Sequence, residues 1–239
     1  MWNLEGQQLV QFKKKYKGGV NRVIFSPDSK RLVVSEWGGA AYLWDLRGNQ
    51  LAEFNYDITT IAFSFNGLQL ATGGFDRTIR LWNKDGKLLT KFKGHAGTIG
   101  NILFTHDGKQ VLTTASDGFA KLWDLEGNQL AIFRGHYKPI RSAILSPNGK
   151  LLATGGCDAK VRLWDLEGNQ LAEFNGREDC IGRITFTTDS KRLFAITESG
   201  VYIWQIEGLE ELRIHGCNWV KDYLNNNPYV EKEYQHICD

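Results

Sequence analysis

Tryptophan recurs in this chain at a nearly constant step of about forty residues, at Trp2, Trp44, Trp82, Trp123, Trp164 and Trp204. A fixed period of this length is typical of repeat proteins, in which each repeat buries its apolar surface only against its neighbours. The 239-residue chain is therefore predicted to be built from consecutive copies of one structural unit.

The clearest copy of this unit is residues 151–176, LLATGGCDAKVRLWDLEGNQLAEFNG. Three short apolar or alternating runs, LLATGG, KVRLW and QLAEF, are separated by turn-forming residues and read as strands. The preceding segment 139–145 is a fourth run of this kind. Because a strand has about six residues, four strands and their connections fill one period and leave no room for a helix. The unit is predicted to be a four-stranded propeller blade.

The order of marker residues in this unit resembles the WD40 repeat family. Gly135-His136, Ser146-Pro147, Asp158 and Trp164-Asp165 follow one another at the family's spacing, and Gly94-His95, Asp117 and Trp123-Asp124 repeat them one period earlier. The resemblance covers residues 1 to 206 and implies an all-β WD40 β-propeller over residues 1–208.

The number of blades is left open, because the first and the last repeat of the pattern are both incomplete. The opening WNLEGQQLVQF matches WDLEGNQLAEF, so the chain begins inside a repeat, and five strand triplets follow at about 20–44, 58–82, 98–123, 139–164 and 181–204. The fifth triplet lacks a clear fourth strand. Residues 7–12 could fill that gap and close a five-bladed ring, which would remove an exposed sheet edge. Alternatively the chain is the last part of a larger propeller, and a homo-oligomer is expected if the ring does not close.

The segment 209–239 departs from the repeat. Apolar residues at Trp219, Val220, Tyr223 and Leu224 predict a short amphipathic helix that ends before Pro228. This helical extension resembles the ending of bacterial, especially cyanobacterial, WD40 proteins, in which the propeller often follows a signalling module.

Composition excludes several classes of function. The net charge of +2, with basic and acidic residues interspersed, gives no support for a nucleic-acid or anionic membrane partner. No apolar run approaches the length of a membrane span and no signal peptide is recognised, so a cytoplasmic location is expected.

The cysteines give no indication of a disulfide framework or of a metal site. Cys157, Cys180, Cys217 and Cys238 occupy unlike positions of the repeats and tail, so free thiols are expected. His215 and His236 each stand two residues before a cysteine, a spacing too tight for an ordinary zinc motif. No metal and no cofactor are expected.

The resemblance implies that a histidine, a threonine, an aspartate and a tryptophan form a buried hydrogen-bonded network in each complete blade. These residues are His95, Thr113, Asp117 and Trp123, then His136, Thr154, Asp158 and Trp164, with a partial set of Thr72, Asp76 and Trp82 after Asn55-Tyr56. Gly38 replaces the aspartate in the first blade, and the fifth has Arg177 and Glu198 at the histidine and aspartate positions. Those degenerate blades are expected to be less stable.

The resemblance also implies that partners bind at one end of the blades. Two kinds of position are used there, the residue before the turn aspartate (Trp37, Phe75, Ser116, Cys157) and the start of the innermost strand (Asn21, Thr59, Arg141). Trp37 and Phe75 are the strongest candidates, because large aromatic side chains dominate interface hot spots.

Two classes of function are consistent with these features. A non-catalytic scaffold for protein–protein interaction, forming the recognition part of a bacterial signalling protein or a truncated relative of one, explains the repeats and the near-neutral charge. A hydrolase-like propeller enzyme would need acids, bases or metal ligands converging on the channel, whereas the corresponding positions differ between blades. A structural fragment without independent activity is a further alternative. The sequence favours the scaffold and predicts no catalytic residue.

Overall fold

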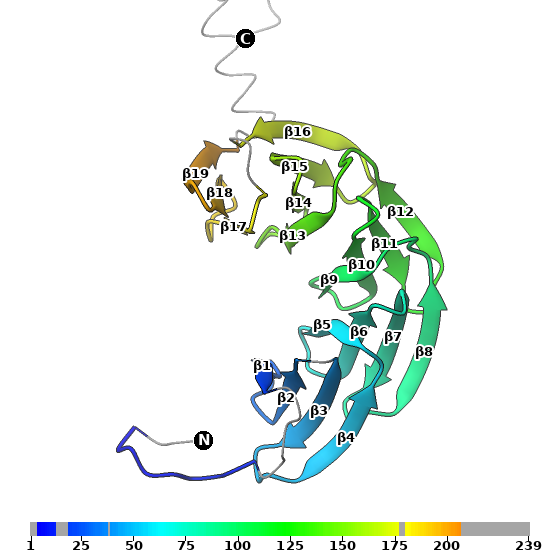
Figure 1. Cartoon of the computed structure of the whole chain (residues 1–239), viewed down its shortest axis with the longest axis vertical. Helices are drawn as coiled ribbons and strands as arrows, with labels where there is room; N and C mark the ends of the chain where they lie inside the picture. Colours follow the sequence, from blue (N-terminus) through cyan, green and yellow to red (C-terminus); the bar gives the residue numbers. More distant parts are fainter. Residues whose placement is uncertain (1–3, 13–18, 38, 177–179, 207–239) are drawn as a thin grey trace, which may run out of the picture.

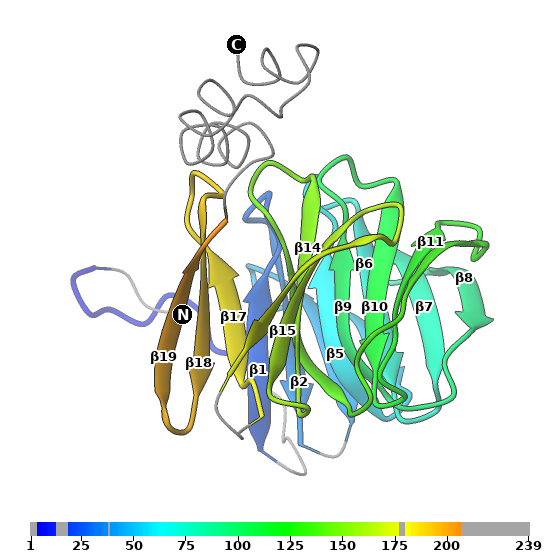
Figure 2. The same ribbon diagram turned by 90° about the horizontal axis from the view of Figure 1, so that it is seen from above.

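The computed structural model describes residues 4–12, 19–37, 39–176 and 180–206. These residues form nineteen strands and no helix, and the strands build five antiparallel sheets arranged along an arc (Figure 1). The prediction of all-β repeats is confirmed. In Figure 2 the strands run lengthwise between two ends of the molecule.

Each sheet is one blade, and its strands pair in chain order from the inner edge outward. Blades one and two consist of β1 (Val20–Phe25), β2 (Arg31–Glu36), β3 (Ala40–Asp45), β4 (Gln50–Asn55), β5 (Ile58–Phe63), β6 (Gln69–Gly74), β7 (Thr78–Asn83) and β8 (Leu88–Lys93). Blade three consists of β9 (Ile99–Phe104), β10 (Gln110–Ala115), β11 (Ala120–Asp124) and β12 (Gln129–Phe133). Blades four and five consist of β13 (Ile140–Leu145), β14 (Leu151–Gly156), β15 (Lys160–Asp165), β16 (Gln170–Asn175), β17 (Arg183–Phe186), β18 (Arg192–Thr197) and β19 (Gly200–Gln205).

A side-chain-bonded turn between the first and second strands recurs in the blades. In blade four the Ser146 hydroxyl donates to Asn148 Oδ1 at 2.7 Å and accepts from the Leu151 N–H at 2.9 Å, while Asn148 Oδ1 also accepts from the Lys150 N–H at 3.0 Å. Gly149 has a φ of +71°, which glycine adopts without the steric cost of a Cβ. The Ser-Pro-Asn-Gly sequence thus fixes the hairpin.

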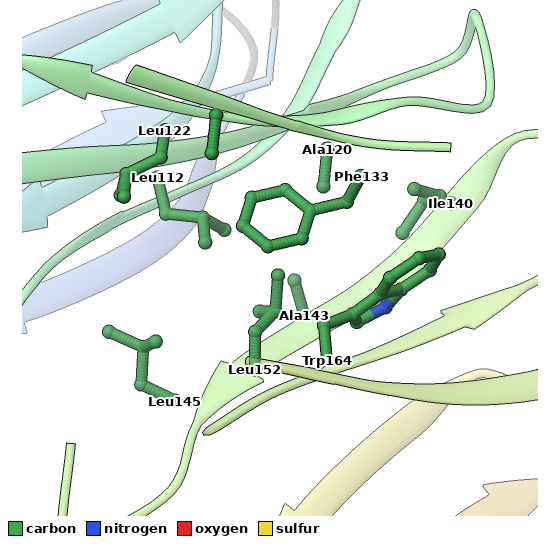
Figure 3. Packing of buried hydrophobic residues seen from close by; sticks show 10 residues of the cluster. Leu112, Ala120, Leu122, Phe133, Ile140, Ala143, Leu145, Leu152 and Trp164 are labelled. Atoms are coloured by element: carbon green, nitrogen blue, oxygen red, sulfur yellow. The ribbon is translucent and has the colours of Figure 1, made fainter. Parts of the chain in front are cut away.

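The core lies between blades, where each tryptophan of a third strand packs on a phenylalanine of the segment before its blade. The ring centroids are 5.7 Å apart for Phe12–Trp44, 4.6 Å for Phe54–Trp82, 5.2 Å for Phe92–Trp123, 5.8 Å for Phe133–Trp164 and 5.2 Å for Phe174–Trp204. Figure 3 shows Phe133 of blade three and Trp164 of blade four facing the same cluster as Leu112, Leu152 and Ile140. Each blade therefore depends on its neighbour for burial.

The predicted closure of the ring by residues 7–12 is not found among the described residues. The fifth sheet has three strands, and the N-terminal segment runs beside blade one, far from β19 in the arc (Figure 1). The physical reason is the open arc of the five blades, which holds β19 far from blade one, where Phe12 joins the buried cluster of Leu32, Val34, Tyr42 and Trp44.

The predicted helix over 209–239 and the boundary at 208 lie outside the described residues, and the two-part division of the chain stays a prediction. Within the part of the chain that the structure describes, no helix has the length and apolar character of a membrane span.

Replacing Phe133 by Ala is expected to destabilise the protein by about 3 to 5 kcal/mol, since it opens a cavity between two rigid sheets. Leu130 lies on the same strand with its side chain half exposed, so Leu130→Ala is the matched control and should cost less than about 1 kcal/mol. Urea unfolding followed by tryptophan fluorescence measures both. Equal losses for the two variants would contradict the interblade position of the core.

Candidate functional site: the top end of the blades

Blade four holds a continuous chain of hydrogen bonds from its core to one end. Trp164 Nε1–H donates to Thr154 Oγ1 at 2.8 Å, and Thr154 Oγ1 lies 2.9 Å from His136 Nε2. His136 Nδ1 lies 2.8 Å from an Asp158 oxygen, and Arg162 donates to the other Asp158 oxygen at 2.9 Å. With Nδ1–H donating to the carboxylate, Nε2 accepts from the threonine, so each group from Trp164 to Asp158 has a partner, whereas Arg162 Nε is buried without one among the described residues.

Burial and the neighbouring charges together set the protonation states of His136 and Asp158. Burial lowers the pKa of His136 below 6.5, with a further contribution from the nearby Arg162 charge, so the imidazole is neutral at pH 7. Burial alone would raise the pKa of Asp158, but its bonds to Arg162 and His136 outweigh this effect and lower it. Arg162 also pairs with Glu173 at 2.9 Å on the neighbouring strand β16.

The glycine before each network histidine makes room for the tryptophan. A Cβ on Gly94 would lie 1.9 Å from Trp123 Cη2, and one on Gly135 would lie 3.0 Å from Trp164 Cη2. The Gly-His pair thus combines a close approach of backbone to ring with an imidazole aimed at the threonine.

Blade three repeats the same arrangement. Trp123 donates to Thr113 at 2.8 Å, Thr113 lies 2.9 Å from His95 Nε2, and His95 Nδ1 lies 3.0 Å from Asp117. Burial would raise the pKa of Asp117, but His95 and the backbone N–H groups of Phe119 and Ala96 lower it from 3.8 to about 2. The carboxylate therefore anchors the turn between β10 and β11.

Blade two replaces the histidine by a tyrosine and an arginine. Trp82 still donates to Thr72 at 3.0 Å, but Asp76 accepts from Arg80 at 2.6 Å. The Arg80 guanidinium lies over the Tyr56 ring at 4.1 Å, and Tyr56 in turn contacts Trp82. A cation–π contact fills the position of the missing imidazole.

Blades one and five lack the threonine of the network. Val34 occupies its position in blade one, and Trp44 Nε1 is buried with no hydrogen-bond partner in the described part of the chain. Ala195 occupies the position in blade five, where Trp204 stacks on Phe174 and Tyr202 instead. Gly38 and Arg177 lie outside the described residues, and Glu198 is exposed.

The buried networks are not arranged for catalysis. Thr154 and Thr113 are fully buried, and each hydroxyl is already shared between a tryptophan and a histidine. A nucleophile without access to substrate cannot react. Within the described ranges, no group of three or more His, Cys, Asp or Glu side chains is placed to hold a metal ion.

The loops after the second strands and the connections between blades lie at the same end of the molecule, here called the top end. Backbone hydrogen bonds join them, from Phe75 N–H to Asp57, from Ser116 N–H to Thr98, and from Cys157 N–H to Pro139. Trp37 and Phe75 sit in these loops on adjacent blades, and their side chains are 64% and 65% exposed. The structure thus presents two large aromatic side chains at one end.

The other predicted partner-binding residues differ in how free their side chains are. Asn21 and Arg141 are exposed, and Ser116 is exposed while its hydroxyl accepts from the Thr98 N–H at 2.9 Å. Thr59 is half-buried and donates to the carbonyl oxygens of Gly73 and Ile99. Thr59 therefore joins neighbouring blades and has little left to offer a ligand.

The expectation of free thiols is wrong for Cys157 and Cys180, which form a disulfide. They lie at unlike positions of the repeat, but the top-end loop of blade four lies against the segment that leads into β17, as the hydrogen bond from Ile181 N–H to the Gly156 carbonyl shows. The bond takes Cys157 out of the set of free top-end side chains. Among the described residues there is no free cysteine, and Cys217 and Cys238 lie outside them.

The inner strands of all five blades line a hollow of about 690 Å³. Its lining includes Arg22, Arg141 and Arg183 and no carboxylate. None of these guanidinium groups has a hydrogen bond or ion pair with a described residue. Of these three arginines, only Arg141 was predicted from the sequence as a partner-binding residue. Arg22 and Arg183 share one position of the innermost strand, which Thr60, Asn101 and Ser142 occupy in the other blades. This shared position is the sequence feature that could have placed both arginines at the hollow.

The family is established by a family model described as "WD domain, G-beta repeat", which matches residues 6–45, 48–83, 86–124 and 127–165. These segments together cover more than half of the chain and contain the networks described above. The chain belongs to the WD40 repeat family.

Three similar proteins are eukaryotic. Periodic tryptophan protein 2 of Arabidopsis thaliana is 27% identical over 105 residues, 42% of this chain and 12% of that protein. The transcriptional corepressor LEUNIG_HOMOLOG of the same plant is 32% identical over 84 residues, 33% of this chain and 11% of that protein. Periodic tryptophan protein 2 homolog of Neurospora crassa is 25% identical over 87 residues, 35% of this chain and 10% of that protein. The matches thus span a small part of each relative, and they give no support to the resemblance with bacterial signalling proteins.

Replacing Val34 by Thr is expected to stabilise the protein by about 1 kcal/mol, because the hydroxyl would take the position from which Thr72, Thr113 and Thr154 accept a tryptophan N–H. The measurement is the shift in thermal unfolding midpoint. The control is Val33→Thr, one residue away on the opposite face of β2 and buried without such a donor, which should destabilise. A loss of stability in both variants would show that Trp44 is satisfied in another way.

Acid is expected to destabilise the protein in two stages. Folding lowers the pKa of His136, so the folded protein binds a proton there less readily than the unfolded chain does. The neutral imidazole therefore contributes its full stability above the unfolded pKa of about 6.5, and this stability is lost as the pH falls below that value. The lowered pKa of Asp117 adds a contribution of at most about 2 kcal/mol that is complete above about pH 4 and lost as pH falls towards 2. Thermal unfolding of the wild type and His136→Ala from pH 8 to 3 tests this. His136→Ala should have a lower midpoint at pH 8 and lack the first stage, and an unchanged profile would contradict the assignment.

Proposed function

We propose that this chain is a non-catalytic scaffold that binds protein partners at its top end. The observation that carries the proposal is the pair of exposed aromatic side chains, Trp37 and Phe75, on loops of adjacent blades. Aromatic residues that are already held by a rigid sheet lose little conformational freedom on binding, which is why they dominate hot spots.

The charge of the hollow that the inner strands line indicates the chemistry of the partner. Arg22, Arg141 and Arg183 come from three different blades and face no carboxylate in the lining of the hollow. Guanidinium groups bind carboxylates in a bidentate manner and remain charged at all physiological pH values. An extended segment that carries several acidic side chains and an apolar anchor for Trp37 and Phe75 fits this arrangement.

The scaffold is preferred here over the two alternatives, a hydrolase-like enzyme and a structural fragment without activity. The buried threonine hydroxyls speak against the hydrolase alternative, and the rigid top end favours recognition over a purely structural fragment. One of the similar proteins is named as a transcriptional corepressor, but the match spans 11% of that protein. A role in bacterial signalling and a cytoplasmic location stay predictions from the sequence.

Panning a library of displayed peptides on the purified protein tests the proposal. Enriched peptides are expected to be acidic and to contain an apolar residue. Their affinity, measured by isothermal titration calorimetry, should fall at least tenfold in the double variant Trp37→Ala, Phe75→Ala, since two anchors are removed.

The matched control is Phe65→Ala, because Phe65 is an aromatic residue that is 53% exposed in the turn between β5 and β6, at the opposite end of blade two. This variant should bind the peptides as the wild type does. Undiminished binding by a folded Trp37→Ala, Phe75→Ala variant would overturn the proposed site.

A further inference from the structure

The two outer strands of blade two, β7 and β8, line a pocket of about 450 Å³, and β8 forms the outer edge of the arc there (Figure 1). The residues that line this pocket are Asp76, Thr78, Arg80, Lys91, Phe92 and Lys93. Arginine and two lysines face one carboxylate in this lining, so the pocket has an excess of positive charge. Its volume is in the range of small-ligand pockets.

Blade four shows which group occupies this place when the charges are balanced within the chain. Arg162 of blade four aligns with Arg80 of blade two, because Arg162 lies opposite Glu173 in the sheet as Arg80 lies opposite Lys91. The Glu173 carboxylate accepts from Arg162 Nη2 at 2.9 Å and also pairs with Lys160. Blade two thus has a cation where blade four has the carboxylate that binds its arginine.

The strand pairing of blade two is unfavourable without an added negative charge. Like charges directly opposite each other on neighbouring strands destabilise a sheet. Arg80 and Lys91 are such a pair. Lys91 and Lys93 are exposed, and neither forms an ion pair with a described residue. An anion between these cations would remove the repulsion, as Glu173 does for Arg162 and Lys160 in blade four.

Arg80 is fixed in position beside the pocket. Its Nη2 donates to Asp76 at 2.6 Å, its guanidinium lies over the Tyr56 ring at 4.1 Å, and its side chain is 12% exposed. Its other N–H groups have no partner in the part of the chain that the structure describes, and they are not buried as Nε of Arg162 is. A guanidinium that is already oriented in this way loses little freedom when it binds an anion.

We propose that this pocket of blade two binds the phosphoryl group of a phosphate monoester. The phosphoryl oxygens take the place that the Glu173 carboxylate has in blade four and accept from Arg80, while Lys91 and Lys93 supply the further positive charge. A phosphoryl group suits the pocket better than a carboxylate, because its charge of about −1.5 to −2 at pH 7 matches the excess of cations over Asp76. The site uses neither the exposed aromatic pair nor the arginines of the hollow.

Titration of the full-length chain at constant ionic strength tests the proposal, with amide chemical shifts of β7 and β8 as the readout. The probes are inorganic phosphate and N-acetyl-phosphoserine amide, and both should shift these amides in the wild type. Lys91→Glu should weaken binding at least about tenfold, since it removes a cation and gives Arg80 a carboxylate of its own. Lys93→Gln, which leaves that pair as it is, should weaken binding several-fold.

The two probes distinguish two sources of the phosphoryl group, and either result supports the site. Tighter binding of the phosphoserine amide assigns the pocket to a phosphorylated protein segment. Equal affinity assigns it to a free phosphate ligand.

Lys87→Glu is the matched control, because it makes the same change of charge in the turn between β7 and β8, at the other end of these strands, and should bind both probes as the wild type does. Lys91→Glu should unfold at a temperature no lower than the wild type, since an ion pair replaces two like charges. Absence of phosphate-dependent shifts in β7 and β8, undiminished binding by Lys91→Glu, or equal weakening by Lys87→Glu would each overturn the proposal. The top-end site is measured separately, with the displayed peptides and the Trp37→Ala, Phe75→Ala variant.

Discussion

The packing of a phenylalanine from one blade on a tryptophan of the next is the contact on which the rest of the structure depends. A single antiparallel sheet of four short strands has two faces and cannot bury either by itself. Here the phenylalanine ends an outer strand and the tryptophan ends a third strand, so each pair joins the edge of one blade to the middle of its neighbour. The stability of each blade therefore depends on its contacts with the neighbouring blades, as in other repeat proteins.

The hydrogen-bonded networks use the same tryptophans for a second purpose. The ring of Trp164 packs in the core, while its N–H begins the chain through Thr154 and His136 to Asp158 at the top end. The aspartate then holds the turn that carries the exposed residue before it. Blade two shows that the design tolerates other chemistry, because Arg80 and Tyr56 hold Asp76 without a histidine. In blades two, three and four the core and the top-end loops are thus coupled through the tryptophan of the third strand.

The period of the tryptophans was enough to predict the strands and their order, and the resemblance to the WD40 family predicted the residues of the networks, since all of these are set within one repeat. Contacts between unlike positions of different repeats could not be predicted in this way. Cys157 and Cys180 are joined because the top-end loop of one blade lies beside the entry to the next, which no repeat spacing reveals. Arg22 and Arg183 likewise meet Arg141 around one hollow only when the inner strands of all blades are brought together. Closure by residues 7–12 was left open by the sequence, because the repeat sets the contacts between neighbouring blades and not the distance between the two ends of the arc.

Residues 8–12 therefore have two roles that sequence cannot separate. In a blade, the outer strand pairs with the third strand of its own sheet and also sends its phenylalanine into the next blade, as Phe174 does from β16 to Trp204. At the start of this chain the second contact is made, through Phe12 and Trp44. The sequence repeat corresponds to one sheet, whereas the core is built between two neighbouring sheets, so the contacts of an outer strand always belong to two blades.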